Sequence, residues 1–202
     1  MIKAGITGGI GSGKTIICRA FETFGVPVYN ADLAARLLTD SHPEIRKCLT
    51  EAFGEDIYIG NALNRPRFAS LVFRDRQLLE TANRIIHPWV KEDFNRWATT
   101  HEDCNYIIEE AAILFESGSH ALVDKCITVI SPAELRIKRL MNRSGMTLDR
   151  IEDVMDNQWS DEKKIAASDF IIINDEKQPV LPQILSIHQR LIELSEISSK
   201  DN

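Results

Sequence analysis

Residues 8–15 read Gly-Gly-Ile-Gly-Ser-Gly-Lys-Thr and match the pattern GxxxxGK followed by Ser or Thr. The apolar run Ile2–Thr7 precedes them, and the residues after them carry apolar side chains at helical spacing. A short apolar run predicts a buried strand, so the glycine-rich segment is expected on the turn from a strand into a helix. In that context the pattern predicts a loop that binds the phosphates of a nucleoside triphosphate.

The fixed positions of this loop have chemical reasons. Glycines let the backbone turn tightly and point several N–H groups at one anion, and the helix that follows adds the positive end of its dipole. The Lys14 ammonium is expected at the β- and γ-phosphates, and the Thr15 hydroxyl is expected as a ligand of Mg²⁺. The residues expected to contact the nucleotide are Gly8, Gly9, Ile10, Gly11, Ser12, Gly13, Lys14, Thr15 and Ile16.

The chain beyond the loop predicts an α/β fold with a parallel sheet. Gly25 is placed to end the first helix, because glycine takes the left-handed conformation easily. Val26–Tyr29 then predicts a second strand. Continuous apolar runs, rather than alternating ones, favour parallel strands covered on both faces. Three more runs of this kind are Tyr106–Ile108, Cys126–Ile130 and Phe170–Ile173.

The segment 32–100 predicts helices and no strand. Its expected helices are Asp32–Leu38, Glu44–Phe53, Pro66–Val72, Arg76–Ile86 and Pro88–Trp97. A helical segment of this length between two strands indicates an inserted subdomain rather than a simple crossover. A final amphipathic helix is expected over Pro182–Leu194, and the polar end Ser195–Asn202 is expected to fray.

Length and composition fit one α/β domain that handles small molecules. The chain has 202 residues, within the ~100–200 residues of a usual domain. Its net charge of -6 disfavours a protein devoted to DNA or RNA. No apolar run approaches the ~20 residues that span a bilayer, and no signal segment precedes the first strand, so we expect a soluble, cytoplasmic protein.

The four cysteines, Cys18, Cys48, Cys104 and Cys126, form no CxxC pair. Their spacing fits neither a zinc site nor a disulfide framework. Cys18 and Cys126 lie in apolar stretches and are expected to be small buried hydrophobes.

Asp32 follows the second predicted strand closely. Ligands of an open parallel sheet gather at the carboxyl ends of its strands, so this carboxylate is expected at the same edge as the phosphate loop. There it could accept a proton from an attacking hydroxyl, or orient that hydroxyl and help to hold Mg²⁺. The alternative is an N-cap for a helix that starts at Leu33.

A basic segment follows Ser131. Ser131-Pro132-Ala133-Glu134 has the features of a helix start, with a capping serine and a proline at the first helical position. Arg136, Arg139 and Arg143 then share one helix face, and a second short helix is expected from Leu148 to about Trp159. Arginines that close over a triphosphate stabilise the charge that spreads during transfer, so the segment indicates a mobile lid. The alternative is a solvated basic face.

The residues resemble the dephospho-coenzyme A kinase family over nearly the whole chain. The segments that carry the resemblance, in chain order, are Thr7–Thr15, Asn30–Arg36, Ile86–Pro88, Ile113–Glu116, Arg139 with Arg143, Gln158, and Ser168–Asn174. The resemblance implies transfer of the γ-phosphate of ATP to the ribose 3′-hydroxyl of dephospho-coenzyme A, which is the last step of coenzyme A synthesis.

The resemblance also implies the architecture. We expect a P-loop NTPase fold like that of nucleoside monophosphate kinases, with a five-stranded parallel sheet flanked by helices. The implied nucleotide-binding core consists of residues 1–31, 101–134 and 165–202. Residues 32–100 would form a helical acceptor subdomain, and residues 135–164 an arginine-rich lid.

Site roles follow from the same resemblance. Asp32 takes the base or orienting role beside Lys14, Arg139 and Arg143 contact ATP, and Asn174 lies near the adenine. The residues expected to line the acceptor site are Asp32, Arg36, Arg65, His87, Phe115 and Glu116. ATP and Mg²⁺ are the implied cofactors and dephospho-coenzyme A the implied partner, whereas no nucleic acid or membrane partner is expected.

Two positions depart from the family pattern. Asn30 stands where the family has aspartate, so a base role falls on Asp32 alone. Ala112 stands where the family has proline, which loosens a turn near the expected acceptor site. Two of the expected acceptor residues also fit a structural role: His87 as a helix-start residue held by Pro88, and Glu116 as the partner of a lid arginine.

Other functions stay open from the residues alone, because the same loop serves GTPases, motors and kinases. The chain has no Asn-Lys-x-Asp segment after a late strand, which disfavours a GTPase. Another small-molecule or nucleoside monophosphate kinase of the same fold is one alternative. A non-catalytic ATP-binding regulator is the other, and the intact Lys14, Thr15 and Asp32 disfavour it.

Overall fold

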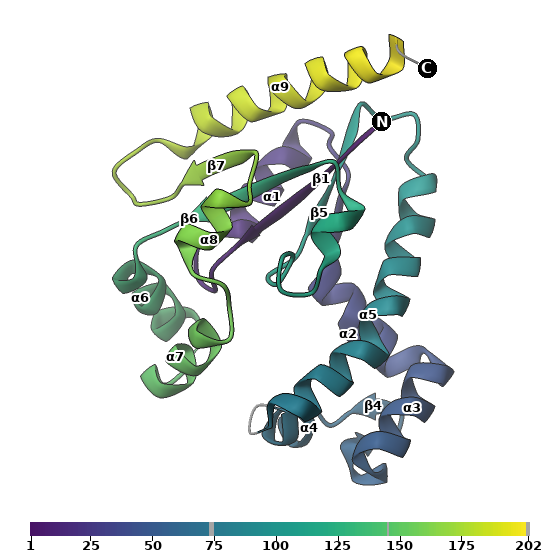
Figure 1. The fold of residues 1–202 in the computed structure, drawn as a ribbon. Coiled ribbons are helices and arrows are strands. Elements are labelled where there is room, and N and C mark those ends of the chain that lie inside the picture. The colour runs from purple at the N-terminus through teal and green to yellow at the C-terminus, as the bar shows by residue number, and fades with distance from the viewer. Residues whose placement is uncertain (73–74, 145, 201–202) are drawn as a thin grey trace. The chain divides into compact units, whose positions relative to one another are not determined.

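The computed structural model describes residues 1–72, 75–144 and 146–200, and it describes no side chain at residues 143, 144, 199 and 200 (Figure 1). The chain divides into two compact units. The first, here called the sheet unit, consists of Met1–Asn30 and Ala98–Asn202. The second, here called the helical unit, is Ala31–Trp97.

The sheet unit is built on five parallel strands in the order β2-β5-β1-β6-β7. The strands are β1 (Ile2–Gly8), β2 (Val28–Asn30), β5 (Tyr106–Glu110), β6 (Lys125–Ile130) and β7 (Phe170–Ile173). The register sets Asn30 and Ile6 opposite Glu110, and Gly8 opposite Val129. The carboxyl ends of the strands therefore meet at one edge, as the apolar runs predicted for a parallel sheet.

Helices cover both faces of this sheet. The helices that pack on its strands are α1 (Lys14–Thr23), α8 (Asp161–Ala166) and α9 (Val180–Lys200). Helices α6 (Ala133–Ser144) and α7 (Leu148–Asp156) pack on each other, and a 3₁₀ turn covers Ser119–Leu122. Figure 1 shows α1 behind the sheet and α8 in front of it. The core between the sheet, α1 and α9 contains Ile6, Phe21, Ile108 and Leu191, each fully buried.

Gly25 ends α1 as the sequence predicted. Its φ is 78°, its N–H donates to Glu22 O, and the N–H of Val26 donates to Phe21 O. This pair of bonds satisfies the last carbonyls of the helix in the Schellman arrangement and returns the chain to β2.

Helix α9 is longer than predicted. Fraying was expected over Ser195–Asn202, but the helix continues to Lys200, and residues 201–202 lie outside the described part of the chain. Ser195 is buried and its hydroxyl donates to Ile192 O. Its polar side chain is thus satisfied inside the helix, which the composition alone did not reveal.

The helical unit contains α2 (Ala31–Ser41), α3 (Pro43–Phe53), α4 (Arg65–Val72) and α5 (Arg76–Thr99), the last two residues of α5 belonging to the sheet unit. The prediction of separate helices over Arg76–Ile86 and Pro88–Trp97 was wrong. Pro88 lies inside one continuous helix, although an interior proline costs ~3 kcal/mol. Ile85, Ile86 and Trp89 pack against the buried cluster of this unit and offset that cost.

The prediction of no strand between residues 32 and 100 was also wrong. A 3₁₀ turn at Glu55–Ile57 leads into a small antiparallel hairpin, β3 (Tyr58–Ile59) and β4 (Ala62–Leu63). Gly60 turns the chain with a φ of 60°. Leu63 is buried and its N–H donates to Asp40 Oδ1 at 2.9 Å. Strands of two residues are too short to show an alternating pattern.

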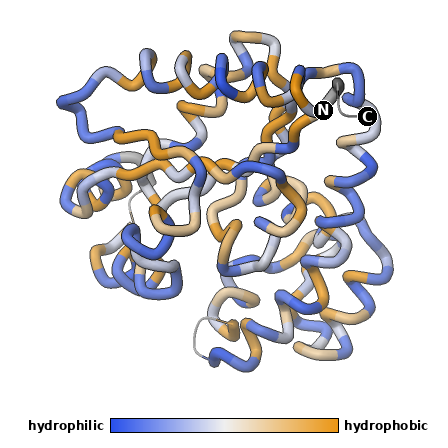
Figure 2. Tube along the Cα trace, turned by 45° about the horizontal axis from the view of Figure 1, so that its top comes forward, coloured by the Kyte–Doolittle hydropathy of each residue, from blue (hydrophilic) through white to orange (hydrophobic). Residues whose placement is uncertain are grey.

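The hydropathy of the helices agrees with this arrangement. Helices carry both hydrophilic and hydrophobic residues in alternation (Figure 2), as expected for helices with one covered face. Among the residues that the structure describes, no helix is long and apolar enough to cross a membrane.

Candidate active site

The glycine-rich loop joins β1 to α1 and has a conformation that its glycines permit. Gly11 and Gly13 have φ values of 78° and 98°, in the left-handed region. The Ser12 N–H donates to Gly9 O at 3.1 Å and closes a tight turn. Asn174, just beyond β7, donates from Nδ2 to Ser12 O at 2.7 Å. Asn174 thereby lies against the phosphate loop.

Lys14 is folded onto its own loop. Its ammonium is buried and donates to Gly8 O at 2.8 Å and to Gly9 O at 3.4 Å. The side chain expected at the β- and γ-phosphates is thus bonded to the carbonyls of its own loop in this structure.

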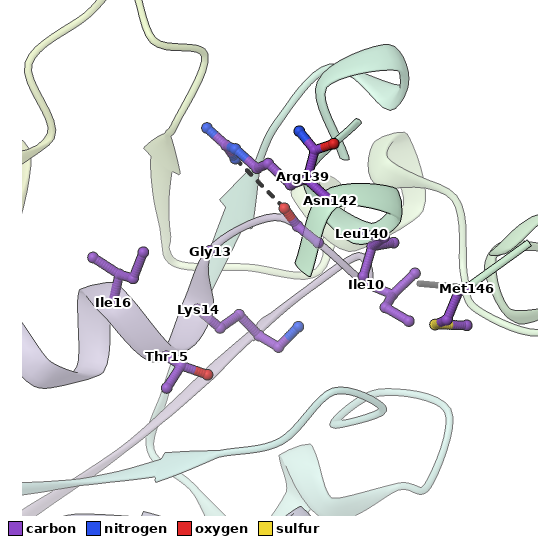
Figure 3. Close-up of a pocket in the computed structure, with 10 residues that line it drawn as sticks. Ile10, Gly13, Lys14, Thr15, Ile16, Arg139, Leu140, Asn142 and Met146 are labelled. Carbon is purple, nitrogen blue, oxygen red and sulfur yellow. Dashed lines mark hydrogen bonds between the residues drawn. The ribbon is translucent and has the colours of Figure 1, made fainter. Parts of the chain in front are cut away.

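A cavity of about 690 Å³ opens beside the loop, within the ~300–1,000 Å³ usual for small-molecule sites. One wall is the loop and the start of α1, and the other is Arg139, Leu140, Asn142 and Met146 from α6 and the residues after it (Figure 3). The predicted phosphate loop and the predicted lid helix thus line one pocket.

Glu110 joins the site although no sequence motif marks it. It ends β5, and its carboxylate accepts from Thr15 Oγ1 at 2.7 Å and from Asn30 Nδ2 at 2.8 Å. Asn30, the residue that departs from the family pattern, therefore orients a carboxylate instead of acting as one. The available signal was the position of Glu110 at the carboxyl end of a strand.

Arg139 lies against the loop and donates several hydrogen bonds. Its Nη1 donates to Gly11 O at 3.4 Å, to Ser12 O at 3.5 Å and to Ser131 Oγ at 3.1 Å. Its Nη2 donates to Asn174 O at 3.4 Å and to Glu176 Oε1 at 3.0 Å. The structure thus brings together Arg139, Asn174 and the phosphate loop, and the Ser131 hydroxyl, expected as a helix cap, accepts from Arg139.

The other two arginines of that helix differ. Arg143 lies on α6, but its side chain is outside the described part of the structure. Arg136 has only 10% of its side chain exposed, and its Nη2 lies 3.5 Å from Asp161 Oδ2. The interpretation of the arginines as a solvated basic face is wrong for Arg136. The expected second helix is also shorter than predicted, because α7 ends at Asp156.

Phe115 and Glu116 follow β5 and contact Trp159 and Lys164, at the end of the predicted lid segment. The Phe115 ring stacks on Trp159 with centroids 5.4 Å apart and planes at 8°. Glu116 Oε1 accepts from the Trp159 N–H at 2.7 Å and lies 3.1 Å from Lys164 Nζ. Glu116 therefore pairs with the buried Lys164. Of the lid arginines that were the alternative partners, Arg143 has its side chain outside the described part of the structure.

The remaining expected residues belong to the helical unit. Asp32 lies within the first turn of α2, which begins at Ala31, so the interpretation as an N-cap before Leu33 is wrong. Arg65 Nη2 donates to Asp40 Oδ2 at 2.6 Å and to Arg36 O at 3.0 Å.

His87 lies inside α5 rather than at a helix start, which contradicts the alternative that Pro88 holds it there. Burial lowers the pKa of its imidazole below the usual 6.5. The ring is therefore neutral at pH 7.

The buried cysteines offer no reactive thiol. Burial raises the pKa of Cys18, with the nearby Glu110 carboxylate adding to the effect. Burial also raises the pKa of Cys126 to about 11. Both side chains stay protonated near neutral pH and pack as small hydrophobes, as predicted.

Comparison with known proteins agrees with this geometry. The family model described as dephospho-CoA kinase matches residues 2–179. A dephospho-CoA kinase of Bacteroides fragilis is 42% identical over 187 residues, which cover 92% of this chain and 91% of the relative. One of Porphyromonas gingivalis is 39% identical and covers 93% of each chain.

Among solved structures, the protein TT1252 of Thermus thermophilus superposes with a TM-score of 0.81 at 27% identity, covering 96% of this chain and 97% of that one. The fold is therefore shared along nearly the whole length. A complete phosphate loop, the pocket beside it and the family match together show that the chain belongs to the dephospho-CoA kinase family.

Proposed function

We propose that this protein transfers the γ-phosphate of ATP to the ribose 3′-hydroxyl of dephospho-coenzyme A and releases coenzyme A and ADP in the cytoplasm. The observation that carries the proposal is the family match over residues 2–179 of a chain whose phosphate loop is intact. The pocket of about 690 Å³ between that loop and α6 supports it, because its size suits a nucleotide.

The loop and its neighbours are proposed to hold ATP. Lys14 would leave the carbonyls of Gly8 and Gly9 and neutralise the terminal phosphates. Arg139 and Arg143 would contact ATP from the lid, residues 135–164. Asn174, whose side chain bonds to the loop at Ser12 O, would lie beside the adenine.

Thr15 and Glu110 fit a magnesium site. A hydroxyl and a carboxylate oxygen lie 2.7 Å apart at the edge of the sheet, and oxygen donors of this kind are the ones Mg²⁺ prefers. Thr15 and Glu110 would hold Mg²⁺ there, and the ion would supply positive charge that stabilises the negative charge developing during transfer. Asn30 would keep the Glu110 carboxylate turned toward Thr15.

The acceptor is proposed to bind to residues 32–100 and to the segment after β5. Asp32 would accept the proton of the 3′-hydroxyl or orient that hydroxyl for attack. Arg36, Arg65, His87, Phe115 and Glu116 are the proposed lining residues. The bond from Arg65 to Arg36 O supports the grouping of these two arginines.

The test is ADP release by the purified protein with dephospho-coenzyme A, compared with AMP, CMP, dCMP and shikimate as acceptors. We expect stimulation by dephospho-coenzyme A alone, and a product that carries a new phosphate on the 3′-oxygen by ³¹P NMR. Stimulation by another acceptor instead would favour a different kinase of this fold. ATP binding without stimulation by any acceptor would favour a non-catalytic regulator.

A further inference from the structure

Gln158 makes two long-range hydrogen bonds that join separate parts of the sheet unit. It lies between α7 and α8, outside both helices. Its Oε1 accepts from the N–H of Ile10, in the phosphate loop, at 2.8 Å. Its Nε2 donates to the carbonyl oxygen of Ala112, just after β5, at 3.2 Å. An N–H at one end and a carbonyl at the other allow only one orientation of the amide.

The peptide that Gln158 holds is the Gly9–Ile10 peptide, and Lys14 holds its other side. The Gly9 carbonyl of this peptide accepts from Lys14 Nζ at 3.4 Å and from Ser12 N–H at 3.1 Å. When Lys14 moves to the terminal phosphates, its bond to this carbonyl is lost, whereas the bond from Ile10 to Gln158 involves no atom of Lys14.

Gln158 is itself held firmly on the segment after β5. The next residue, Trp159, donates from its N–H to Glu116 Oε1 at 2.7 Å and stacks on Phe115. Lys164, with 0% of its side chain exposed, lies 3.1 Å from the same carboxylate oxygen. The amide of Gln158 therefore projects to the loop from a segment that contacts Phe115 and Glu116.

We propose that Gln158 is a positioning residue for phosphoryl transfer, which keeps the Gly9–Ile10 peptide in place when Lys14 turns from its loop carbonyls to ATP. The proposal rests on the proposed function of the protein. Positioning of this kind stabilises the transition state because the loop needs no rearrangement while the phosphoryl group moves. It also ties the loop to Ala112, in the segment proposed to meet the acceptor.

The test uses Gln158→Met, which keeps the length and bulk of the side chain but removes both hydrogen bonds. We expect kcat to fall ~10–100-fold, the range for a small misplacement at a site of phosphoryl transfer. The KM for ATP should change by less than about threefold, because an interaction needed mainly in the transition state acts on kcat. Both constants come from ADP release at saturating dephospho-coenzyme A.

Gln183→Met is the matched control. Gln183 also bridges backbone groups of the sheet unit: its Oε1 accepts from Ile173 N–H at 2.8 Å, and its Nε2 donates to Ile173 O at 3.0 Å and to Pro179 O at 3.1 Å. We expect a similar loss of stability in this variant and a kcat close to that of the wild type. An equal fall of kcat in both variants would overturn the proposal, because it would indicate general loosening.

A second readout does not depend on activity. Amide hydrogen exchange of Ile10, followed by ¹⁵N NMR in the protein without nucleotide, should be faster in Gln158→Met and unchanged in Gln183→Met. If Gln158→Met does not fold, Gln158→Ala gives the same kinetic test, because it also removes both the acceptor for Ile10 N–H and the donor to Ala112 O.

The possible results separate the two proposals. A wild-type kcat in Gln158→Met, or a loss confined to the KM for ATP, would overturn the role of Gln158 while the proposed function stands. A wild type without turnover on dephospho-coenzyme A would overturn the proposed function. In that case, an unchanged rate of amide hydrogen exchange at Ile10 in Gln158→Met would also refute the claim that Gln158 keeps the Gly9–Ile10 peptide in place.

Discussion

The phosphate loop and the helical unit are built in opposite ways. In the loop, the backbone conformation requires particular residues. Gly11 and Gly13 have positive φ values, and two loop carbonyls accept hydrogen bonds from Lys14. In the helical unit, the residues are required instead by apolar packing around Ile45 and Leu49. A change in the loop should therefore remove activity before stability, and a change in the apolar cluster should do the reverse.

Lys14→Met should have the largest effect. It removes the cation expected at the terminal phosphates, and the loss of one such electrostatic group lowers kcat/KM by ~10³-fold. The fold should remain, because the methionine chain fills the same space beneath the loop. Steady-state ADP release and circular dichroism check both statements. If Lys14→Met loses activity only because it unfolds, the expected difference between the loop and the helical unit is wrong.

Leu49→Ala should act on stability instead. Leu49 is fully buried in the cluster with Ile45, Ile57 and Leu63, and a Leu-to-Ala change in a core costs ~2–5 kcal/mol. Urea unfolding measures the loss. The matched control is Leu37→Ala, at a leucine of α2 that is 59% exposed, where we expect a change within ~0.5 kcal/mol. Equal losses in the two variants would contradict the assignment of the cluster as a core.

Asp32→Asn tests whether the helical unit also carries chemistry. We expect turnover to fall by ~10²-fold with ATP affinity nearly intact, as for the loss of a general base or an orienting carboxylate. The control is Asp56→Asn, which removes a carboxylate of the same unit that pairs with Arg67 at the surface. Unchanged turnover in Asp32→Asn would remove Asp32 from the mechanism.

The smallest expected effect is on the pH dependence of stability. Burial lowers the pKa of His87 below 6.5, so the unfolded chain binds this proton more tightly than the folded protein does. As pH falls below about 6.5, the free energy of unfolding should therefore decrease until the lowered pKa is passed.

His87→Gln should flatten that decrease, as measured by urea unfolding between pH 7 and pH 5. His101→Gln, at a partly exposed histidine of the sheet unit, is the comparison. The same flattening in both variants would show that burial of His87 is not the cause.

The sequence was most informative where a pattern of residues is required by the conformation or the burial of the backbone. The residues 8–15 require a tight anion-binding turn, and the continuous apolar runs require a covered parallel sheet, so the loop, the first βαβ unit and the end of α1 at Gly25 could be predicted. The helical unit offered weaker signals. Its hairpin at Tyr58–Leu63 is too short to alternate, and the packing of Trp89 keeps α5 continuous through Pro88.

Tertiary contacts decide the parts of the site that the sequence missed. Glu110 looks like any residue at the end of an apolar run until Thr15 and Asn30 are seen to bond its two oxygens. Gln158 was named from the family resemblance, but its bond to Ile10 was not foreseen, because the two residues are 148 positions apart along the chain. Lys164 looks like a surface lysine of a short polar helix, yet it is fully buried beside Glu116. No local pattern contains these pairings, because each depends on two elements that meet only in the fold.

Gly9 has a consequence for how this sequence can vary. Its φ does not require glycine, but a methyl group at this position would collide with the guanidinium of Arg136. The two positions are therefore linked. Gly9→Ala should force the Arg136 guanidinium to move, and it should be better tolerated once Arg136 is shortened to alanine. In a library that varies both positions, side chains at position 9 should survive selection mainly together with small residues at position 136.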